Sequence, residues 1–85
     1  MQSIGWQLWA KPLSGGSLAV LVLNRAVPSL AADIDLGALG FAGSVTIRDL
    51  HLRKDLGVFA GHYTAPAIGP HDSVLLKLTP LSLIV

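Results

Sequence analysis

The sequence contains no cysteine, and only 13% of its 85 residues are charged. Without cysteine, neither a disulfide framework nor a thiolate metal site can form, and the redox compartment cannot be inferred. The six Lys and Arg residues are spread singly, and the net charge is +1. There is no basic stripe of the kind that binds nucleic acid or a membrane surface, so partners of these two classes are not expected.

Long hydrophobic runs are also missing. The longest, Leu18 to Leu23, has six residues, whereas a membrane-spanning helix needs about 20. The N-terminus, MQSIGWQLWAKPL, lacks the basic start and apolar stretch of a signal peptide. We therefore expect neither a membrane span nor a signal peptide, and the residues leave the localisation unknown.

No window keeps the i, i+3, i+4, i+7 apolar spacing of an amphipathic helix. Nine Gly and five Pro instead divide the chain into short segments, with a turn signal about every 8 to 12 residues, as in a β-sandwich. We predict strands at residues 5–10, 17–24, 29–36, 44–52, 58–64 and 73–79. The predicted turns and loops are 13–16, 37–43, 54–57 and 66–72. Residues 1–85 are short enough to form a single domain.

The run Leu18 to Leu23 is apolar at every position, which indicates a central strand covered on both faces. Because Leu18 is larger than Ala19, we place Leu18 and the alternate residues that follow it in the core, and the others outward. The predicted core residues are Leu18, Val20 and Val22. The predicted outward residues are Ala19, Leu21 and Leu23, and a bare patch of that kind predicts self-association of the isolated domain.

Segment 44–52 is less regular, because its apolar residues change parity between Ile47 and Leu50. A β-bulge or bend at Arg48-Asp49 would restore the register.

Residues that carry chemistry are few. Asp33 and Asp35 share one face of an alternating strand, but nothing apolar beside them would separate their pKa values, so we interpret them as a solvated face. His51, His62 and His71 lie far apart and lack metal-ligand spacing. The run GALGFAG is not a phosphate-binding glycine motif, and no G-x-S-x-G elbow occurs. We therefore assign no catalytic, cofactor-binding or metal-binding residue, and no cofactor.

Aromatic side chains could form a sugar-binding platform. Trp6 and Trp9 are three residues apart and so point to opposite faces of a strand. We expect them, with Phe41, Phe59 and Tyr63, to be core or interface residues.

Several blocks of residues, in order and spacing, resemble one family. They are Trp9-Ala10-Lys11-Pro12-Leu13, Gly16-Ser17 leading to Leu23-Asn24-Arg25, Ile47-Arg48-Asp49-Leu50, Lys54-Asp55-Leu56-Gly57, and Pro70-His71 before Val74-Leu75-Leu76-Lys77-Leu78. From about Trp9 to Pro80, the chain closely resembles the C-terminal β-sandwich domain of family 27 glycoside hydrolases, the α-galactosidases. It departs from the family pattern at His51, where a bulky aromatic is common, and at Asp72, where a glycine is frequent.

The resemblance implies an all-β fold, an antiparallel Greek-key β-sandwich of about six to eight short strands. In the family this domain follows a (β/α)8 barrel that holds two catalytic aspartates, whose motifs have no counterpart here. The chain would then be a non-catalytic module, not an enzyme by itself, of a parent that hydrolyses terminal α-galactosyl groups with retention of configuration. Such parents are often secreted or lysosomal.

The expected partner is the barrel of the same parent polypeptide, with Ala19, Leu21 and Leu23 at the interdomain interface. Local loops could instead cover these residues. A carbohydrate-binding module or a small interaction domain is the alternative function, and a small hydrolase in its own right ranks third. The residues do not reveal the parent's substrate, the origin of the fragment, the oligomeric state or the role of the apolar tail from Leu81 to Val85.

Overall fold

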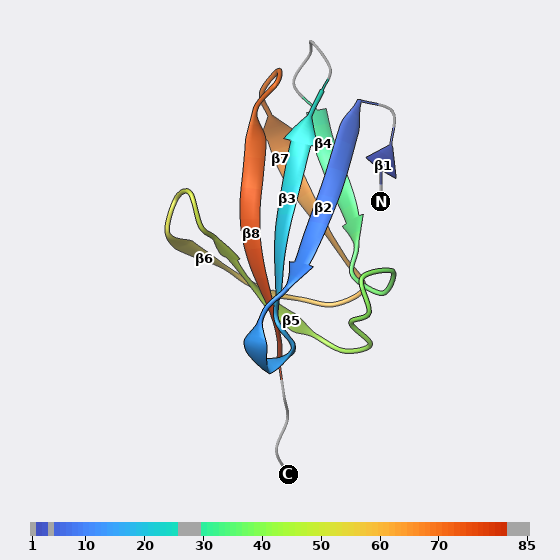
Figure 1. The fold of residues 1–85 in the computed structure, drawn as a ribbon, viewed down its shortest axis with the longest axis vertical. Coiled ribbons are helices and arrows are strands. Elements are labelled where there is room, and N and C mark those ends of the chain that lie inside the picture. Colours follow the sequence, from blue (N-terminus) through green and yellow to red (C-terminus); the bar gives the residue numbers. More distant parts are fainter. Residues whose placement is uncertain (1, 4, 26–29, 82–85) are drawn as a thin grey trace.

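The computed structural model describes residues 2–3, 5–25 and 30–81, and these are mostly β-strand (Figure 1). The strands are β1 (Gln2–Ser3), β2 (Trp6–Pro12), β3 (Leu18–Asn24), β4 (Leu30–Asp35), β5 (Val45–Asp49), β6 (Lys54–Phe59), β7 (His62–Ile68) and β8 (Ser73–Pro80). A short 3-10 turn at Ser14–Gly16 joins β2 to β3. The predicted all-β class is confirmed. Ser29 and residues 82–85 of the apolar tail lie outside the described residues.

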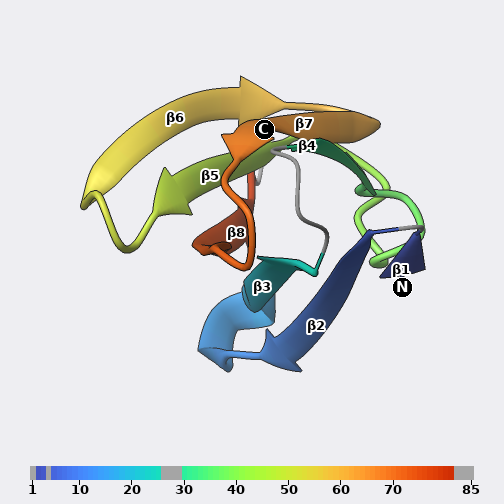
Figure 2. The same cartoon turned by 90° about the horizontal axis from the view of Figure 1, so that it is seen from above.

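The strands form two antiparallel sheets. The large sheet has the order β1-β2-β3-β8-β5-β6, and the small sheet consists of β4 and β7. Seen from above, β2 and β3 lie on one side of the molecule and β4 and β7 on the other (Figure 2). The last strand, β8, lies between β3 and β5, so neighbours in space are distant in sequence, as in Greek-key sandwiches.

The core fills the space between the sheets. It consists of Trp6, Leu8, Val20, Val22, Ala32, Ile34, Leu36, Val45, Ile47, Ala65, Ile68, Leu76 and Leu78. Val20 and Val22 are 0% exposed, which confirms their predicted place. Leu18 is only partly buried and packs against this core, because it begins β3 at the open end of the sandwich.

The predicted strand at 58–64 and the predicted turn at 54–57 are both wrong. The structure has one strand, β6, that begins at Lys54 and another, β7, that begins at His62. The bend between them falls at Ala60-Gly61, where Gly61 adopts a positive φ of 82° that a glycine tolerates without strain. At this bend the chain leaves the large sheet and enters the small one (Figure 2).

A register shift does occur beside Arg48, but the extra residue is on the partner strand. Ile47 pairs with Gly57 and Arg48 pairs with Asp55, so Leu56 of β6 is left over. β5 itself alternates regularly from Val45 to Asp49. The bulge predicted within β5 is therefore misplaced by one strand.

The parity change in segment 44–52 has a different cause, because β5 ends at Asp49 rather than continuing to Leu52. The Asp49 carboxylate accepts a hydrogen bond from the Leu52 backbone N–H at 2.9 Å. A turn closed by an aspartate side chain in this way is a common end for a strand. Leu50 and Leu52 thus lie in the turn between β5 and β6.

The predicted loop at 66–72 begins too early, since β7 continues to Ile68. Ala32 pairs with Ala65, but the next pair is Leu30 with Ile68, so β7 carries one extra residue here. Pro66 lies in this irregular stretch, where its lack of a backbone N–H does not interrupt a regular ladder. The proline therefore marks a bulge and not the end of the strand.

Candidate functional site

The two faces of β3 are unequal in composition and burial. Val20 and Val22 point into the core, so Ala19, Leu21 and Leu23 lie on the outer face of the large sheet. These three are half-buried, neither enclosed nor fully exposed. Their role as an interface stays a prediction, and their incomplete burial is compatible with it.

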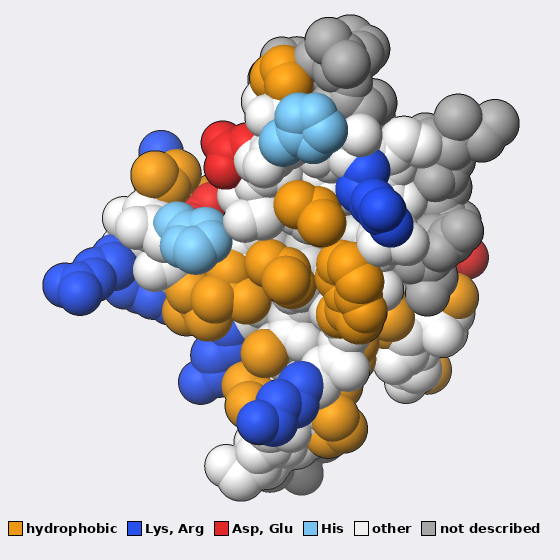
Figure 3. Space-filling view, turned by 45° about the horizontal axis from the view of Figure 1, so that its top comes forward, with side chains coloured by type: hydrophobic (Ala, Val, Ile, Leu, Met, Phe, Trp, Pro, Cys, Tyr) orange, Lys and Arg blue, Asp and Glu red, His pale blue; other side chains and the backbone are white. Residues whose placement is uncertain are grey.

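The register of the large sheet places other apolar side chains beside them. Trp9 of β2 and Leu75 of β8 both pair with Leu21, one on each side. Trp9 is 51% exposed, and Leu75 is half-buried. The outer patch is defined here as Trp9, Ala19, Leu21, Leu23 and Leu75. Figure 3 shows hydrophobic side chains gathered at the surface on this side, with Lys and Arg side chains around them.

Basic residues border the outer patch on the same face. Lys11 pairs with Ala19, and Ala19 in turn pairs with Lys77. Lys77 also pairs with Arg48, whose guanidinium donates to the Asp55 carboxylate at 2.8 Å. A shallow hollow lies over this part of the sheet, lined by Thr46, Ile47, Arg48, Asp55, Gly57, Val58, Lys77 and Thr79.

The outer face of the small sheet is polar. Asp33 and Asp35 of β4 are exposed, as the interpretation of a solvated face predicts. The Thr64 hydroxyl donates to the Asp33 carboxylate at 3.2 Å, and the Ala38 N–H donates to the Asp35 carboxylate at 3.1 Å. These exposed carboxylates serve local hydrogen bonds.

The three histidines come from separate places. His62 begins β7, whereas His51 and His71 lie in the turns before β6 and before β8. Within the described ranges, no three His, Asp or Glu side chains gather closely enough to hold a metal ion. The same ranges contain no helix long and apolar enough to cross a membrane.

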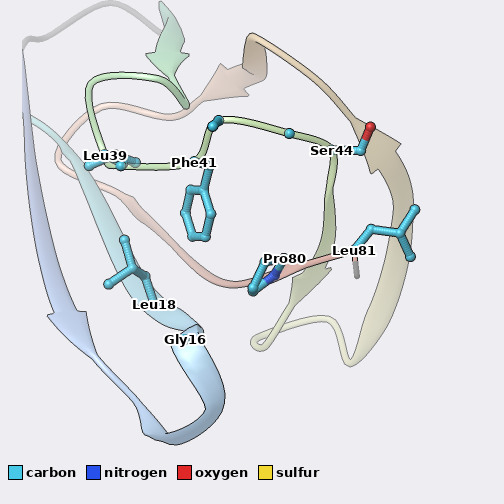
Figure 4. Close-up of a pocket in the computed structure, with 10 residues that line it drawn as sticks. Gly16, Leu18, Leu39, Phe41, Ser44, Pro80 and Leu81 are labelled. Atoms are coloured by element: carbon cyan, nitrogen blue, oxygen red, sulfur yellow. The ribbon is translucent and has the colours of Figure 1, made fainter. Parts of the chain in front are cut away.

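An apolar pocket opens at the end of the sandwich, between the 36–44 loop, the start of β3 and the end of β8 (Figure 4). Leu18, Leu39, Phe41, Ser44, Pro80 and Leu81 line it, together with small residues of the loop. None of the lining residues carries an ionisable side chain. The pocket therefore offers neither an acid nor a base for hydrolysis.

The aromatic residues do not form a sugar-binding platform. Trp6 is buried at 8% exposure and Trp9 is exposed, so the two tryptophans lie on opposite faces as predicted. Phe59 and Tyr63 stack edge to face with ring centroids 4.7 Å apart, and both pack against the core. Trp9 is thus the single exposed aromatic ring among the described residues.

Sequence reasoning missed the role of Asn24, which is 0% exposed at the end of β3. Its side-chain amide donates to the carbonyls of Ile68 at 2.9 Å and Gly69 at 3.0 Å. It ties β3 to the chain that leaves β7. The signal in the sequence is a polar residue placed where the alternation of β3 points inward.

Comparison with known proteins places the chain in a family. Residues 3–78 match the family described as the alpha galactosidase C-terminal beta sandwich domain. This match covers most of the chain, so the chain belongs to that family. The predicted resemblance to the C-terminal β-sandwich domain of the α-galactosidases is confirmed.

Individual relatives agree. A probable alpha-galactosidase of Dictyostelium discoideum is 35% identical in an alignment 77 residues long, which covers 87% of this chain and 20% of that protein. An alpha-galactosidase of Oryza sativa subsp. japonica is 30% identical over 76 residues, which make up 89% of this chain and 18% of that protein. A family 27 β-L-arabinopyranosidase from Geobacillus stearothermophilus has a TM-score of 0.90 and 25% identity, covering 100% of this chain and 19% of its own. The chain therefore spans about a fifth of the length of these relatives.

Proposed function

We propose that residues 1–85 form one β-sandwich domain that packs on the catalytic (β/α)8 barrel of its parent polypeptide and stabilises that barrel. The outer patch is the observation that carries this proposal. It leaves a tryptophan 51% exposed beside four half-buried apolar residues, on a small domain whose opposite face is polar, and contiguous apolar patches at a surface can mark interaction sites. The predicted residues Ala19, Leu21 and Leu23 form its centre, and Trp9 and Leu75 extend it to both neighbouring strands.

The parent activity that we propose is the retaining hydrolysis of terminal α-galactosyl groups. The names of the two curated relatives support it. The solved β-L-arabinopyranosidase shares the sandwich, so the sandwich does not select the sugar. Selection would belong to the barrel, and the parent's activity is to be tested with α-galactosides and β-L-arabinopyranosides side by side.

The packing is tested by placing Leu21→Asn in the parent polypeptide and in the isolated chain. In the isolated chain, Leu21 is already partly open to water, so we expect a loss of about 1 kcal/mol or less in the free energy of unfolding. In the parent, the barrel would bury the rest of the leucine, so the substitution should cost a further 1–1.5 kcal/mol, roughly half of the value for burying a whole leucine side chain. Urea unfolding of both proteins measures the difference.

The matched control is Leu52→Asn, the same change at a leucine that is 69% exposed in the turn before β6. It should have the same small effect in both proteins. An equal loss for Leu21→Asn in the parent and in the isolated chain would rule out the outer patch as the interface.

A further inference from the structure

One row of the large sheet carries charge across the outer face. Reading across four strands, the paired positions are Lys11, Ala19, Lys77 and Arg48. Asp55 continues the row on β6 as the partner of Arg48. Residues directly opposite one another in a sheet point to the same face, so all five belong to the outer face.

The charges of this row do not balance. Arg48 is satisfied within the chain, because it donates to the Asp55 carboxylate at 2.8 Å and to the Arg53 carbonyl at 3.1 Å. For the part of the chain that the structure describes, the Arg48–Asp55 pair is the single ion pair. Lys11 and Lys77 are both exposed, and neither has an acidic partner there. Two positive charges therefore border the outer patch without compensation.

The small side chain of Ala19 leaves space between the two lysines. Adjacent strands lie about 4.8 Å apart, so the Lys11 and Lys77 backbones are separated by about 10 Å across β3. A carboxylate standing over Ala19 lies within reach of both flexible ammonium groups. The apolar row of Trp9, Leu21 and Leu75 runs parallel to it, two residues or about 7 Å along the strands.

We propose that the barrel surface which meets the outer patch presents a carboxylate over Ala19, where Lys11 and Lys77 both bind it. This proposal rests on the proposed function and names the chemistry of the partner surface: an apolar strip with an acidic group about 7 Å to one side. The partner is the remainder of the parent polypeptide, since the chain accounts for only 18–20% of its curated relatives. Opposite charges at such a rim fix the register of the docked surfaces.

The test is charge reversal in the parent polypeptide, with Lys77→Glu and Lys11→Glu made separately. Arg53→Glu is the matched control, since it changes the net charge equally at an exposed turn position outside the row. The thermal unfolding midpoint is measured for the parent and for the isolated chain, at about 20 mM and about 500 mM salt, because screening weakens exposed ion pairs across this range. Lys77→Met keeps the apolar stem of the side chain and serves where a glutamate prevents folding.

We expect either lysine reversal to lower the parent's midpoint by several degrees at low salt, and by less than half as much at high salt. The lysine reversals in the isolated chain, and Arg53→Glu in the parent, should shift the midpoint by no more than about two degrees and with little dependence on salt, as exposed surface substitutions do. If Lys77→Glu and Arg53→Glu shift the parent's unfolding midpoint equally, or if salt does not alter the shift, the proposed carboxylate over Ala19 is wrong. In that case the response of the parent to Leu21→Asn still decides separately whether the outer patch is the interface.

Discussion

Asn24 is a buried polar residue whose role depends on backbone groups far along the chain. Its amide donates to two carbonyls, those of Ile68 and Gly69, at a site that water does not reach. We expect Asn24→Ala to leave both carbonyls without this donor and to lower the free energy of unfolding by about 2–3 kcal/mol. Urea unfolding of the isolated chain measures the loss.

The matched control for Asn24 is Thr64→Ala, which removes a hydrogen bond to Asp33 on an exposed face and should cost about 0.5 kcal/mol or less. Asn24→Asp adds a second check, because it turns an oxygen toward the two carbonyls. Burial raises the pKa of the new carboxyl, and protonation restores one donor. This variant should therefore regain stability as the pH falls, whereas an unchanged deficit at low pH would contradict the assigned contacts.

Tyr63 supplies a prediction for alkaline pH. Burial and the nearby Asp49 charge, in that order, raise the pKa of Tyr63 above the usual 10.0. The folded chain therefore holds the phenol proton more tightly than the unfolded chain does. As the pH rises above about 10, the unfolded state binds fewer protons than the folded state, so this contribution to stability is lost.

The chain contains one tyrosine, so the ultraviolet absorbance of the phenolate reports the ionisation of Tyr63 alone. Unfolding with urea should shift the titration back toward 10.0. Asp49→Asn keeps an oxygen for the Leu52 N–H and should lower the pKa of Tyr63 in the folded chain only in part, since burial is the larger cause. The idea fails if the folded and unfolded chains titrate together.

The sequence predicts some residue positions well and others poorly, for a physical reason. Side chains alternate between the two faces of a strand, so the direction of each one follows from its own strand. This alternation is enough to predict that Val20 and Val22 lie inside and that the two tryptophans lie on opposite faces. Asn24 was missed because its partners, the carbonyls of Ile68 and Gly69, come from the end of another strand. A strand pattern carries no information about such a distant partner.

Among the elements, the β5–β6 hairpin depends on one glycine. Gly57 adopts a φ of 122° beside the unpaired Leu56, a backbone conformation that side chains other than glycine rarely adopt. We expect Gly57→Ala to cost about 1–2 kcal/mol of stability through backbone strain. A Cβ there meets the Phe59 ring only at 3.8 Å, which is ordinary contact, so crowding adds little.

Gly43→Ala is the control for this prediction, since a Cβ at Gly43 meets nothing within 4 Å and no positive φ is required there. It should be neutral or slightly stabilising in the same unfolding experiment. A comparable loss for both variants would show that the glycine at 57 is not required by its conformation.

The strand boundaries that were wrong share a cause at this scale. The composition of residues 54–57 is typical of a turn, but this segment pairs with β5 and belongs to strand β6. Conversely, Gly61 looks like the middle of a strand but lies where the chain changes sheets. Tertiary pairing decides both cases and outweighs local propensity. The sandwich class itself was predictable because it requires only many short strands with frequent turns.

At the scale of the whole molecule, the isolated chain has an outer patch with no barrel to cover it. Two copies that met through this face would bury Trp9, Leu21 and Leu75 of each, but they would also bring Lys11 and Lys77 of one copy toward those of the other. Like charges across an interface oppose association, and salt screens them. We therefore expect weak self-association of the isolated chain that becomes stronger as salt is raised.

Salt should therefore weaken the packing of the outer patch on the parent's barrel but strengthen its contact with a second copy. The barrel is proposed to bring a carboxylate to the two lysines, whereas a second copy brings only lysines. The Debye length falls from roughly 20 Å at about 20 mM salt to roughly 4 Å at about 500 mM salt. Sedimentation equilibrium of the isolated chain at these two salt concentrations measures its self-association. Leu21→Lys should keep the chain monomeric at both salt concentrations, because it adds charge and removes apolar area at the centre of the patch. Self-association that Leu21→Lys leaves unchanged would place the contact on another surface, and self-association that weakens with salt would contradict the lysine repulsion.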